Sequence, residues 1–426
     1  MMEDQENHIQ IDPKIIVALI SALVSVVSAA IPILSDTERN FFLVAFAFLL
    51  ALILMGVCVY ILFRKRLYVA IAALLLLSGS VLSSFFAQQV VKPPEALSYL
   101  DTTVSVYAGN GEREFRDGAF DDCSFVIPAC MSAYQDKLYV TDSDRIRCLE
   151  NGVVTTEPFP SSHYNARLIR NLEADLYVLA ENRQMESGKY YNFFIRIRNG
   201  ELEVVSEKFE VGAFSASVSD FAFSKSGVLW FIRLYDVPGT ASATLQKLSY
   251  DRDADRYGPP EWVMDFHYEA DDMKDARMTF DADDNLYISV PGQGVILRQG
   301  RDEPECTLFA GEDGNHTFND QAPFTFSYPT ALLPENGALY VLDNGVVRRL
   351  RIDGNRAVSC ETLAGVTPEV LNSGKKNVRG VGVGESVAGT EFAFPADVTA
   401  SLALDRRGRL LLSDPENGFL YQIWEN

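Results

Sequence analysis

The chain begins with three long apolar runs. Residues 15–34, 41–63 and 67–91 contain no Asp, Glu, Lys or Arg. A helix rises about 1.5 Å per residue, so roughly 20 residues cross a hydrocarbon core of about 30 Å. The runs therefore predict three transmembrane helices in an anchor at 14–91. A helical hairpin buried in a soluble domain is the alternative, but three such runs in succession exceed what soluble cores use.

The short loops between these runs predict their orientation. The link at 64–66 is Arg-Lys-Arg, whereas the link at 35–40 has one Arg and two acids. Short loops rich in Lys and Arg stay in the cytoplasm. This predicts a cytoplasmic N-terminal segment at 1–13, and a linker at 92–101 that leads to an extracytoplasmic domain. An acidic N-terminal flank and two further runs argue against a cleaved signal peptide. We therefore predict an integral plasma-membrane protein with a membrane-embedded N-terminal part.

Beyond residue 101 the pattern changes to short strands separated by Gly, Asp and Asn turns. A phrase of the type Leu-Tyr-Val recurs, with starts 38, 53, 57, 53 and 71 residues apart. Its six copies begin at Leu138, Leu176, Leu229, Leu286, Leu339 and Leu410. A repeat of about 40–50 residues with four strands is typical of a β-propeller. The sequence thus predicts an all-β six-bladed β-propeller at 102–426, preceded by three transmembrane α-helices.

The two ends of this domain indicate how the ring closes. The sixth copy ends with its third strand at 419–424, and it has no fourth strand. Residues 103–108 read as a fourth strand with no blade before it, similar to 306–311 and 361–365. We therefore expect 103–108 to complete the last blade, which leaves no free sheet edge.

Three of the copies resemble NHL repeats. Their F-x-x-P element is Phe125 to Pro128 in the first copy, and it recurs at 326–329 and 392–395. The resemblance covers blades one, five and six well, whereas blades two to four lack the F-x-x-P and Asp elements. It implies a six-bladed propeller used mostly for binding. A minority of NHL-like relatives are lyases or lactonases with a metal in the central channel.

Two sets of charged residues recur with the repeat. Asp142, Asp343 and Asp414 each follow the Leu-Tyr-Val phrase. Three carboxylates could ring a channel and hold a cation, but recurrence within the repeat favours acceptors of backbone N–H groups in turns. The third strands carry Arg147, Arg198, Arg298 and Arg349. We expect these arginines to be solvated or paired with the acidic surface, with binding of an anionic ligand as the alternative.

No pattern predicts a catalytic or metal site. Asp251 to Asp255 has the spacing that begins a calcium loop, but position six is Arg256 and position twelve is Trp262, so a hairpin turn is expected. The histidines after the membrane runs are far apart in sequence: His163, His267 and His316. We predict no catalytic residue, no metal and no cofactor.

The net charge excludes some classes of partner, and the spacing of the cysteines indicates whether they form disulfides. The formal net charge is −21, and residues 1–100, with seven acids and six bases, contribute −1, which leaves −20 for the rest. Such a domain repels nucleic acid and anionic lipid. Five cysteines follow the membrane runs at irregular spacing, which favours buried thiols over a disulfide scaffold. A Cys123–Cys130 bridge is the alternative.

Irregular loops are the best candidates for binding. An aromatic stretch carries Tyr190 and Tyr191, and the stretch after Trp230 departs from the repeat. The longest insertion, 365–390, is rich in Gly and carries the basic residues Lys375, Lys376 and Arg379. Loops on a rigid scaffold are where binding surfaces usually lie. We predict these six residues as ligand-binding, with tolerated surface insertion as the alternative.

These observations favour a membrane-anchored extracytoplasmic propeller that acts as a binding or sensing module. Its partner would be a peptide, a glycan or a protein, such as an envelope or membrane protein. The alternative is an extracytoplasmic metal-dependent lyase or lactonase on the propeller axis, which needs three or more ligands converging on the channel. Because no catalytic constellation is found, an enzyme is the less favoured hypothesis.

Overall fold

The computed structural model describes residues 97–426, apart from 185–188, 212–216, 238–239, 369, 371–379, 395 and 397–398. Among the described residues, no helix is long and apolar enough to cross a membrane. The three predicted transmembrane helices and the predicted cytoplasmic segment at 1–13 lie outside the described residues, as does the linker up to residue 96.

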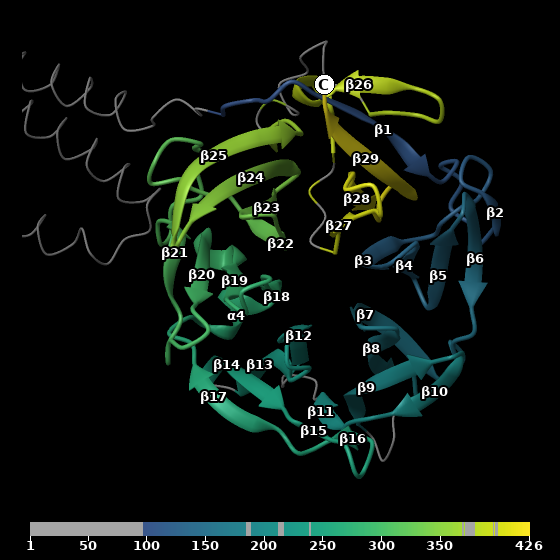
Figure 1. Ribbon diagram of the computed structural model, residues 1–426, viewed down its shortest axis with the longest axis vertical. Helices are drawn as coiled ribbons and strands as arrows, with labels where there is room; N and C mark the ends of the chain where they lie inside the picture. The colour runs from purple at the N-terminus through teal and green to yellow at the C-terminus, as the bar shows by residue number, and fades with distance from the viewer. Residues whose placement is uncertain are drawn as a thin grey trace, which may run out of the picture. The chain divides into compact units, whose positions relative to one another are not determined.

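Antiparallel sheets follow one another around an axis, and Figure 1 looks along it. Blade 1 contains β3 (Pro128–Tyr134), β4 (Lys137–Asp142), β5 (Arg145–Glu150) and β6 (Val153–Glu157), with β2 (Gly118–Ala119) at its edge. Blade 2 contains β7 (Tyr164–Leu172), β8 (Asp175–Asn182), β9 (Tyr190–Arg198) and β10 (Glu201–Val204), and β11 (Phe209–Val211) also pairs with β9. Blade 3 contains β12 (Ser217–Phe223), β13 (Leu229–Val237), β14 (Thr240–Leu248) and β17 (Glu261–Asp265).

The second half of the ring repeats this arrangement. Blade 4 contains β18 (Met278–Phe280), β19 (Leu286–Val290), β20 (Val295–Gln299) and β21 (Thr307–Gly311). Blade 5 contains β22 (Pro329–Glu335), β23 (Ala338–Asp343), β24 (Val346–Asp353) and β25 (Arg356–Ala364). Blade 6 contains β27 (Leu402–Leu404), β28 (Leu410–Asp414), β29 (Phe419–Glu425), β1 (Thr102–Ala108) and β26 (Ser386–Ala388). The predicted six-bladed all-β propeller is confirmed.

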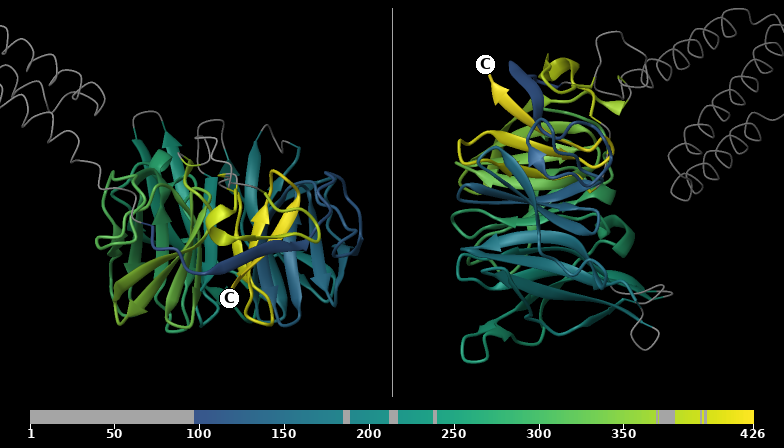
Figure 2. Two further views of the ribbon diagram at one scale, coloured as in Figure 1. Left: turned by 90° about the horizontal axis from the view of Figure 1, so that it is seen from above. Right: turned by 90° about the vertical axis from the view of Figure 1, so that its right-hand side faces the viewer.

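Short elements lie in the connections between strands. They are the hairpin of β15 (Tyr250–Asp251) and β16 (Arg256–Tyr257), helix α4 (Ala270–Met273), and the 3-10 turns η2 (Pro291–Gln293) and η3 (Gly389–Glu391). Seen from the side, the strands run between the two open ends of the ring (Figure 2).

The Leu-Tyr-Val phrase forms the second strand of every blade, and its third residue fills the core. That residue is fully buried in all six copies: Val140, Val178, Phe231, Ile288, Val341 and Leu412. In β19 all five residues are buried. A strand buried on both faces reads as a continuous apolar run rather than an alternating one. The phrase therefore recurs because each blade packs between two others.

The ring closes as predicted. Strand β1 pairs antiparallel with β29, with Val104 opposite Ile423 and Val106 opposite Tyr421. The first described strand thus becomes the fourth strand of the last blade. Beyond the prediction, β26 from the long insertion covers the outer edge of β1, with Val104 opposite Val387. The preceding residues, predicted to be linker, also pair, because the N–H of Leu100 donates to the carbonyl of Thr362 in blade 5.

The turns define two faces of the ring. The connection from the first to the second strand of each blade lies at one end, which we call the hairpin face. The connection from the second to the third strand lies at the other end, the far face. The cysteines described in the propeller are all free, and Cys123, Cys130, Cys148 and Cys360 are buried, with Cys306 half-buried. Burial raises the pKa of Cys123 to about 11, which keeps this thiol protonated at neutral pH.

Candidate functional site

The recurring carboxylates hold strands together. Asp142 is fully buried, and its Oδ1 accepts N–H bonds from Val126 and Ile127, both at 2.8 Å. Its Oδ2 accepts a 2.8 Å bond from Arg147 Nη1. Burial raises the pKa of Asp142, and these bonds oppose the rise. Asp142 therefore accepts backbone N–H groups, as predicted, but from the F-x-x-P segment rather than from the turn that follows it, and it ties that segment to the second strand.

Blade 5 repeats this arrangement with a second acid that is buried, whereas Asp117, the second acid of Arg147 in blade 1, is 48% exposed. Arg348 donates to Asp343 Oδ2 at 3.0 Å, to Asp320 Oδ1 at 2.7 and 3.0 Å, and to the carbonyl of Thr325 at 2.7 Å. The side chains of Arg348, Asp320 and Asp343 are fully buried. The guanidinium also lies 4.5 Å from the ring centroid of Phe326. This is a buried ion triad that fixes the blade.

Blade 6 holds its aspartate without an arginine. Asp414 is fully buried and accepts the N–H of Asn417 in the following turn at 2.9 Å and the hydroxyl of Tyr421 at 3.2 Å. Tyr421 occupies the register of Arg147 and Arg348, because each lies two residues after the residue opposite its aspartate. The three aspartates therefore serve their own blades and do not ring the channel.

The arginines of the third strands are paired, as expected. Arg198 binds Asp175, Arg298 binds Glu303, and Arg349 binds Glu361 and Glu425. The expectation of a surface location is wrong for Arg147, whose side chain is fully buried, and for Arg298 and Arg349, whose side chains are 10% and 9% exposed. Strands alternate their side chains with period two. Arg147 lies opposite the third residue of its Leu-Tyr-Val phrase, whereas Arg298 and Arg349 lie opposite the second, so the basic residues do not share one environment.

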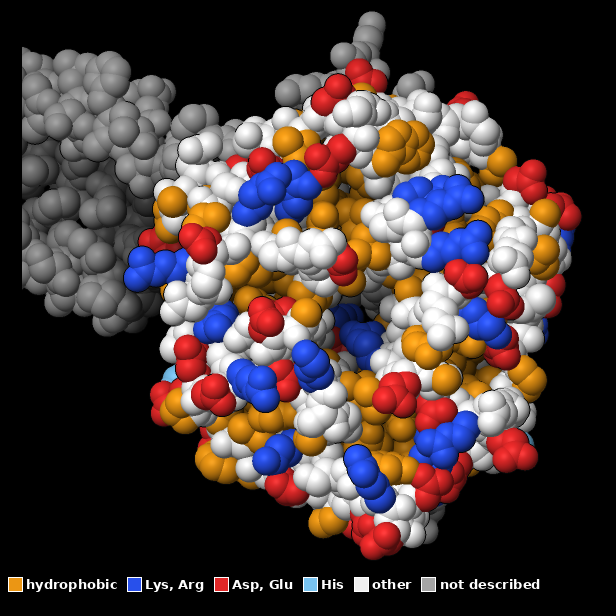
Figure 3. Space-filling view, viewed as in Figure 1, with side chains coloured by type: hydrophobic (Ala, Val, Ile, Leu, Met, Phe, Trp, Pro, Cys, Tyr) orange, Lys and Arg blue, Asp and Glu red, His pale blue; other side chains and the backbone are white. Residues whose placement is uncertain are grey.

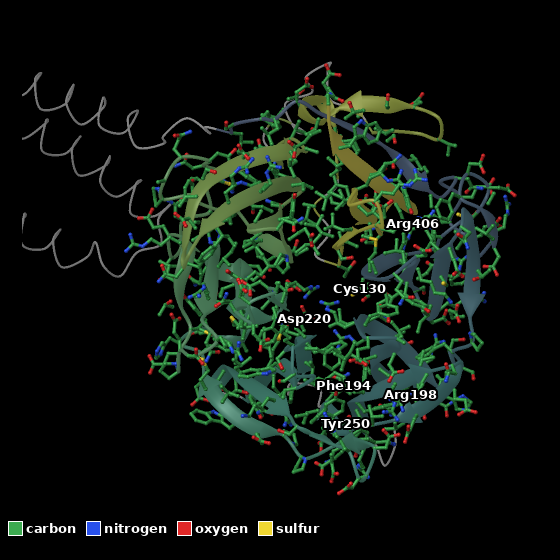
Figure 4. All side chains as sticks on the ribbon, viewed as in Figure 1. Cys130, Phe194, Arg198, Asp220, Tyr250 and Arg406 are labelled. Carbon is green, nitrogen blue, oxygen red and sulfur yellow. The ribbon has the colours of Figure 1, made fainter. Side chains whose placement is uncertain are left out.

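The predicted hairpin turn at Asp251 to Asp255 is confirmed as β15–β16. Asp251 Oδ1 accepts the N–H groups of Asp253 and Ala254, as in a tight turn. Asp255 accepts bonds from Arg196 at 2.7 and 2.9 Å. Blade 3 therefore reaches blade 2 through this hairpin, and Figure 4 labels Tyr250 and Arg198 beside the contact.

This contact predicts an acid-sensitive step. Hydrogen bonds from Arg196 and then Tyr250 lower the pKa of Asp255 below its ordinary value of 3.8. A carboxyl with a depressed folded-state pKa stabilises the fold above its unfolded pKa, and this contribution is lost as the pH falls through the folded-state pKa. We expect Asp255→Asn to lower the melting temperature at pH 7 and to flatten its fall below about pH 4. Melting curves from pH 7 to pH 2.5 measure this.

Asp253 provides the matched control for this measurement. Its exposed side chain lies in the same turn. Asp253→Asn should leave the pH dependence as in the wild type. Identical curves for Asp255→Asn and Asp253→Asn would contradict the assignment of the acid limb to the Arg196 contact.

The first strands of the blades enclose a cavity of about 330 Å³, the axial cavity. Its charged lining comes from Arg170 in β7, Asp220 in β12, Arg277 before β18 and Glu335 at the end of β22. Figure 3 shows the hollow at the centre of the ring, with Lys and Arg side chains at its floor. Figure 4 labels Cys130 and Asp220 close to the axis. None of these four residues belongs to those predicted from the sequence to bind a ligand.

Asp220 connects three blades, and both of its carboxylate oxygens already accept hydrogen bonds. Arg170 Nη2 from blade 2 donates to its two oxygens at 2.8 and 3.0 Å. The N–H of Met278 from blade 4 donates to Oδ2 at 2.9 Å, and the N–H of Phe221 donates to Oδ1 at 2.8 Å. Asp220 is fully buried, so it serves as a structural clamp rather than as a metal ligand.

Arg170 is held in one position by its neighbours. Its Nη1 donates to Cys130 Sγ at 2.9 Å and to the carbonyl of Ile169 at 2.8 Å. Burial alone would lower the pKa of Arg170, but the charge of Asp220 and the contact with Cys130 outweigh it and raise the pKa. The floor of the cavity therefore carries a fixed, permanently charged guanidinium.

The rest of the cavity is balanced in charge. Arg277 Nη1 donates to the carbonyls of Asp275 and Ala276 at 3.3 and 3.1 Å. Glu335 is exposed at the hairpin face, and no other described residue forms an ion pair with it. Two guanidinium groups face two carboxylates, so the lining carries no net charge. Such a cavity offers N–H donors below and a carboxylate acceptor at its mouth, which suits a ligand with hydroxyl groups.

The described residues provide no metal centre. No group of three or more His, Cys, Asp or Glu is close enough to hold an ion within the described part of the chain. His163, His267 and His316 are exposed, and none of them lines the axial cavity.

The residues predicted to bind a ligand lie at separate places. Trp230 is the second residue of β13, near the hairpin face. It lines a cavity of about 170 Å³, and its ring lies 5.8 Å from Phe280 and 5.9 Å from Lys247 Nζ. Tyr190 and Tyr191 begin β9 at the far face and are partly buried. The structure therefore does not bring Trp230 and the two tyrosines together. The predicted basic residues lie outside the described residues: Lys375, Lys376 and Arg379.

Comparison with known proteins supports the fold class, a six-bladed β-propeller. An auxiliary nutrient binding protein from Bacteroides thetaiotaomicron has a similar structure, with a TM-score of 0.52 and 16% identity over 77% of this chain and 78% of that chain. One from Bacteroides ovatus gives a TM-score of 0.55 and 16% identity over 76% and 77%. No protein-family model and no curated protein sequence matches the chain. At this level of identity the similarity shows the fold alone.

Proposed function

We propose that the protein is a membrane-anchored, extracytoplasmic binding protein that holds a small neutral polar ligand, such as a sugar, in the axial cavity. The observation that carries the proposal is the balanced lining of this cavity, with guanidinium groups at its floor and Glu335 at its mouth. Its volume of about 330 Å³ lies within the usual range for small-molecule sites. The nutrient-binding description of the two similar structures favours the same class of function.

Membrane anchoring is part of the proposal. The apolar runs at 15–34, 41–63 and 67–91 and the Arg-Lys-Arg link between the last two support it. A cytoplasmic N-terminus and an extracytoplasmic propeller follow from this charge pattern. The NHL-like character is likewise proposed, and the buried Phe125 and Phe326 beside their Arg–Asp pairs support it.

An envelope or membrane protein partner stays a prediction. Tyr190 and Tyr191 mark the far face, and Lys208 Nζ lies 6.0 Å from the ring of Tyr191. The basic insertion with Lys375 and Lys376 extends the same hypothesis. The lyase or lactonase alternative finds less support, because the carboxylates that line the axial cavity are Asp220, which is saturated with hydrogen bonds, and Glu335.

Calorimetric titration of the full chain in nanodiscs tests this function. Neutral mono- and oligosaccharides should bind saturably, and Glu335→Gln should weaken binding about tenfold or more, because a hydrogen bond to a charged group contributes about 1.5–3 kcal/mol. Glu201→Gln is the control, since Glu201 is exposed on β10. If neutral sugars do not bind, or if Glu335→Gln binds them as the wild type does, the axial cavity is not their site.

A further inference from the structure

A second cavity lies where the ring closes. It has a volume of about 380 Å³ and opens at the hairpin face between blades 6 and 1. We call it the seam groove. Its defining residues are Tyr107, Phe120, Lys137, Arg406, Arg407 and Arg409. They come from β1, from the segment between β2 and β3, from β4, and from the turn between β27 and β28. Figure 4 labels Arg406 at this junction.

The seam groove is positively charged, whereas the domain around it is negatively charged. Four cations line it against two carboxylates, Asp136 and Asp405, which gives a net charge of +2. The chain beyond residue 100 has a net charge of −20, from −21 for the whole chain less −1 for residues 1–100. In Figure 3 Lys and Arg side chains gather over this junction. A cavity of opposite sign to its surroundings concentrates anions that the remaining surface repels.

One arginine of the groove is fixed. Arg409 donates from Nε to Asp405 Oδ2 at 2.7 Å and from Nη1 to Gln422 Oε1 at 2.6 Å. Its guanidinium lies 5.1 Å from the ring centroid of Tyr107. Burial alone would raise the pKa of Asp405, but hydrogen bonds from Arg409 outweigh it and lower the pKa. The ion pair of Arg409 and Asp405 is therefore a fixed part of the wall of the seam groove.

The other cations are available to a ligand. Arg406 contacts Asp136 at 3.1 Å, with side chains 48% and 56% exposed. Lys137 contacts Glu150 at 3.7 Å, with both side chains about 40% exposed. Exposed ion pairs of this kind contribute little and exchange readily. Arg407 is exposed, and no other described residue forms an ion pair with it.

The groove also has an aromatic wall. The rings of Tyr107 and Phe120 lie 5.1 Å apart, and both side chains are half-buried. Aromatic rings present a large apolar surface at low cost in side-chain entropy. The groove therefore combines guanidinium groups for an anionic group with a flat surface for a ring.

We propose that the seam groove binds a small molecule that carries one carboxylate or phosphate group beside a ring. The planar fork of an arginine matches both groups with two parallel hydrogen bonds. The site is separate from the axial cavity, whose lining has no net charge. A bound ligand touches β1, blade 6 and blade 1 at once. It therefore stabilises the closed ring, since a ligand that binds only the folded state shifts unfolding by mass action.

Three ligands that differ only in the group at carbon 6 of the sugar test the proposal. Titration calorimetry of the full chain in nanodiscs at low salt uses D-glucuronate, D-glucose 6-phosphate and uncharged D-glucose. We expect at least one anion to bind, to raise the melting temperature, and to bind more weakly as salt screens the charges. The Arg406→Gln/Arg407→Gln variant should lose at least tenfold in affinity for that anion. Preference between the two anions identifies the carboxylate or the phosphate as the group recognised.

Matched variants separate this proposal from that for the axial cavity. Arg252→Gln/Arg356→Gln removes two exposed arginines outside the groove and should bind the anion as the wild type does. Glucose binding that is equal in the wild type and in both double variants belongs to the axial cavity and leaves the seam groove unaffected. The proposal is overturned if neither anion binds, or if the Arg406→Gln/Arg407→Gln variant, with an unchanged melting temperature, binds the anion with wild-type affinity.

Discussion

Replacing Arg348 with methionine is expected to lower the free energy of unfolding of the propeller by about 3–5 kcal/mol, because breaking a buried ion pair leaves uncompensated buried charge. Here two carboxylates, Asp320 and Asp343, would lose their cation while their side chains stay fully buried. Burial already raises the pKa of Asp343, so its ionised form depends on Arg348. Urea denaturation of the full chain in detergent, followed by circular dichroism, measures the change.

Two variants make this result specific. Arg351 lies on the same strand with its side chain 56% exposed, so Arg351→Met should change the stability by less than about 1 kcal/mol. Adding Asp320→Asn and Asp343→Asn to Arg348→Met removes the stranded charges and should restore more than half of the loss. A loss below about 1 kcal/mol for Arg348→Met alone would show that the triad is not needed.

Removal of β29 is expected to abolish cooperative unfolding. The deletion of 419–426 removes the buried side chains of Leu420, Tyr421 and Ile423 and leaves β1 without its inner partner. It also exposes β28 as an open sheet edge, which invites pairing with other chains. Thermal melting by circular dichroism should show a broad transition at lower temperature, and light scattering should show aggregation.

A cross-link between β1 and β29 tests the same closure of the ring by strengthening it. Ser105 and Gln422 face each other and are bonded at 2.9 Å. Cysteines at both positions should form a disulfide and raise the stability by about 2–4 kcal/mol when oxidised, and not when reduced.

Deletion of Asn426 alone is the control for the truncation. A truncated chain that melts like the wild type would mean that the ring does not depend on β29.

The repeat could be predicted because each copy buries the same position. Full burial of Val140 and its five equivalents is what keeps the Leu-Tyr-Val phrase recognisable. The closing strand could be predicted because residues 103–108 had strand character and no blade. Strand β26 could not be predicted, since its three residues bind β1 through backbone groups that every residue carries.

The charged residues inside the fold were harder to place. Arg147 and Arg349 look alike in sequence, but Arg147 lies opposite the third residue of its Leu-Tyr-Val phrase and Arg349 opposite the second, and a difference of one position moves a side chain to the other face of a strand. Asp220 stands out as the single charge of β12, whereas Arg170 shares β7 with Arg167, so Asp220 alone gave a usable signal. The contact between Arg170 and Asp220 depends on how the blades meet at the axis. The seam groove likewise joins segments from both ends of the propeller.

The closure of blade 6 also sets an order of events during synthesis. Ser105 and its partner Gln422 are 317 residues apart in the chain. A ribosome that adds roughly 5–20 residues per second takes about 15–60 s to make that stretch. Throughout this time β1, whose sequence TTVSVYA favours strand formation, has no β29 to pair with. The nascent protein therefore carries β1 as an unpaired strand until its final blade is made. A stalled ribosome would leave this strand free to pair with neighbouring chains.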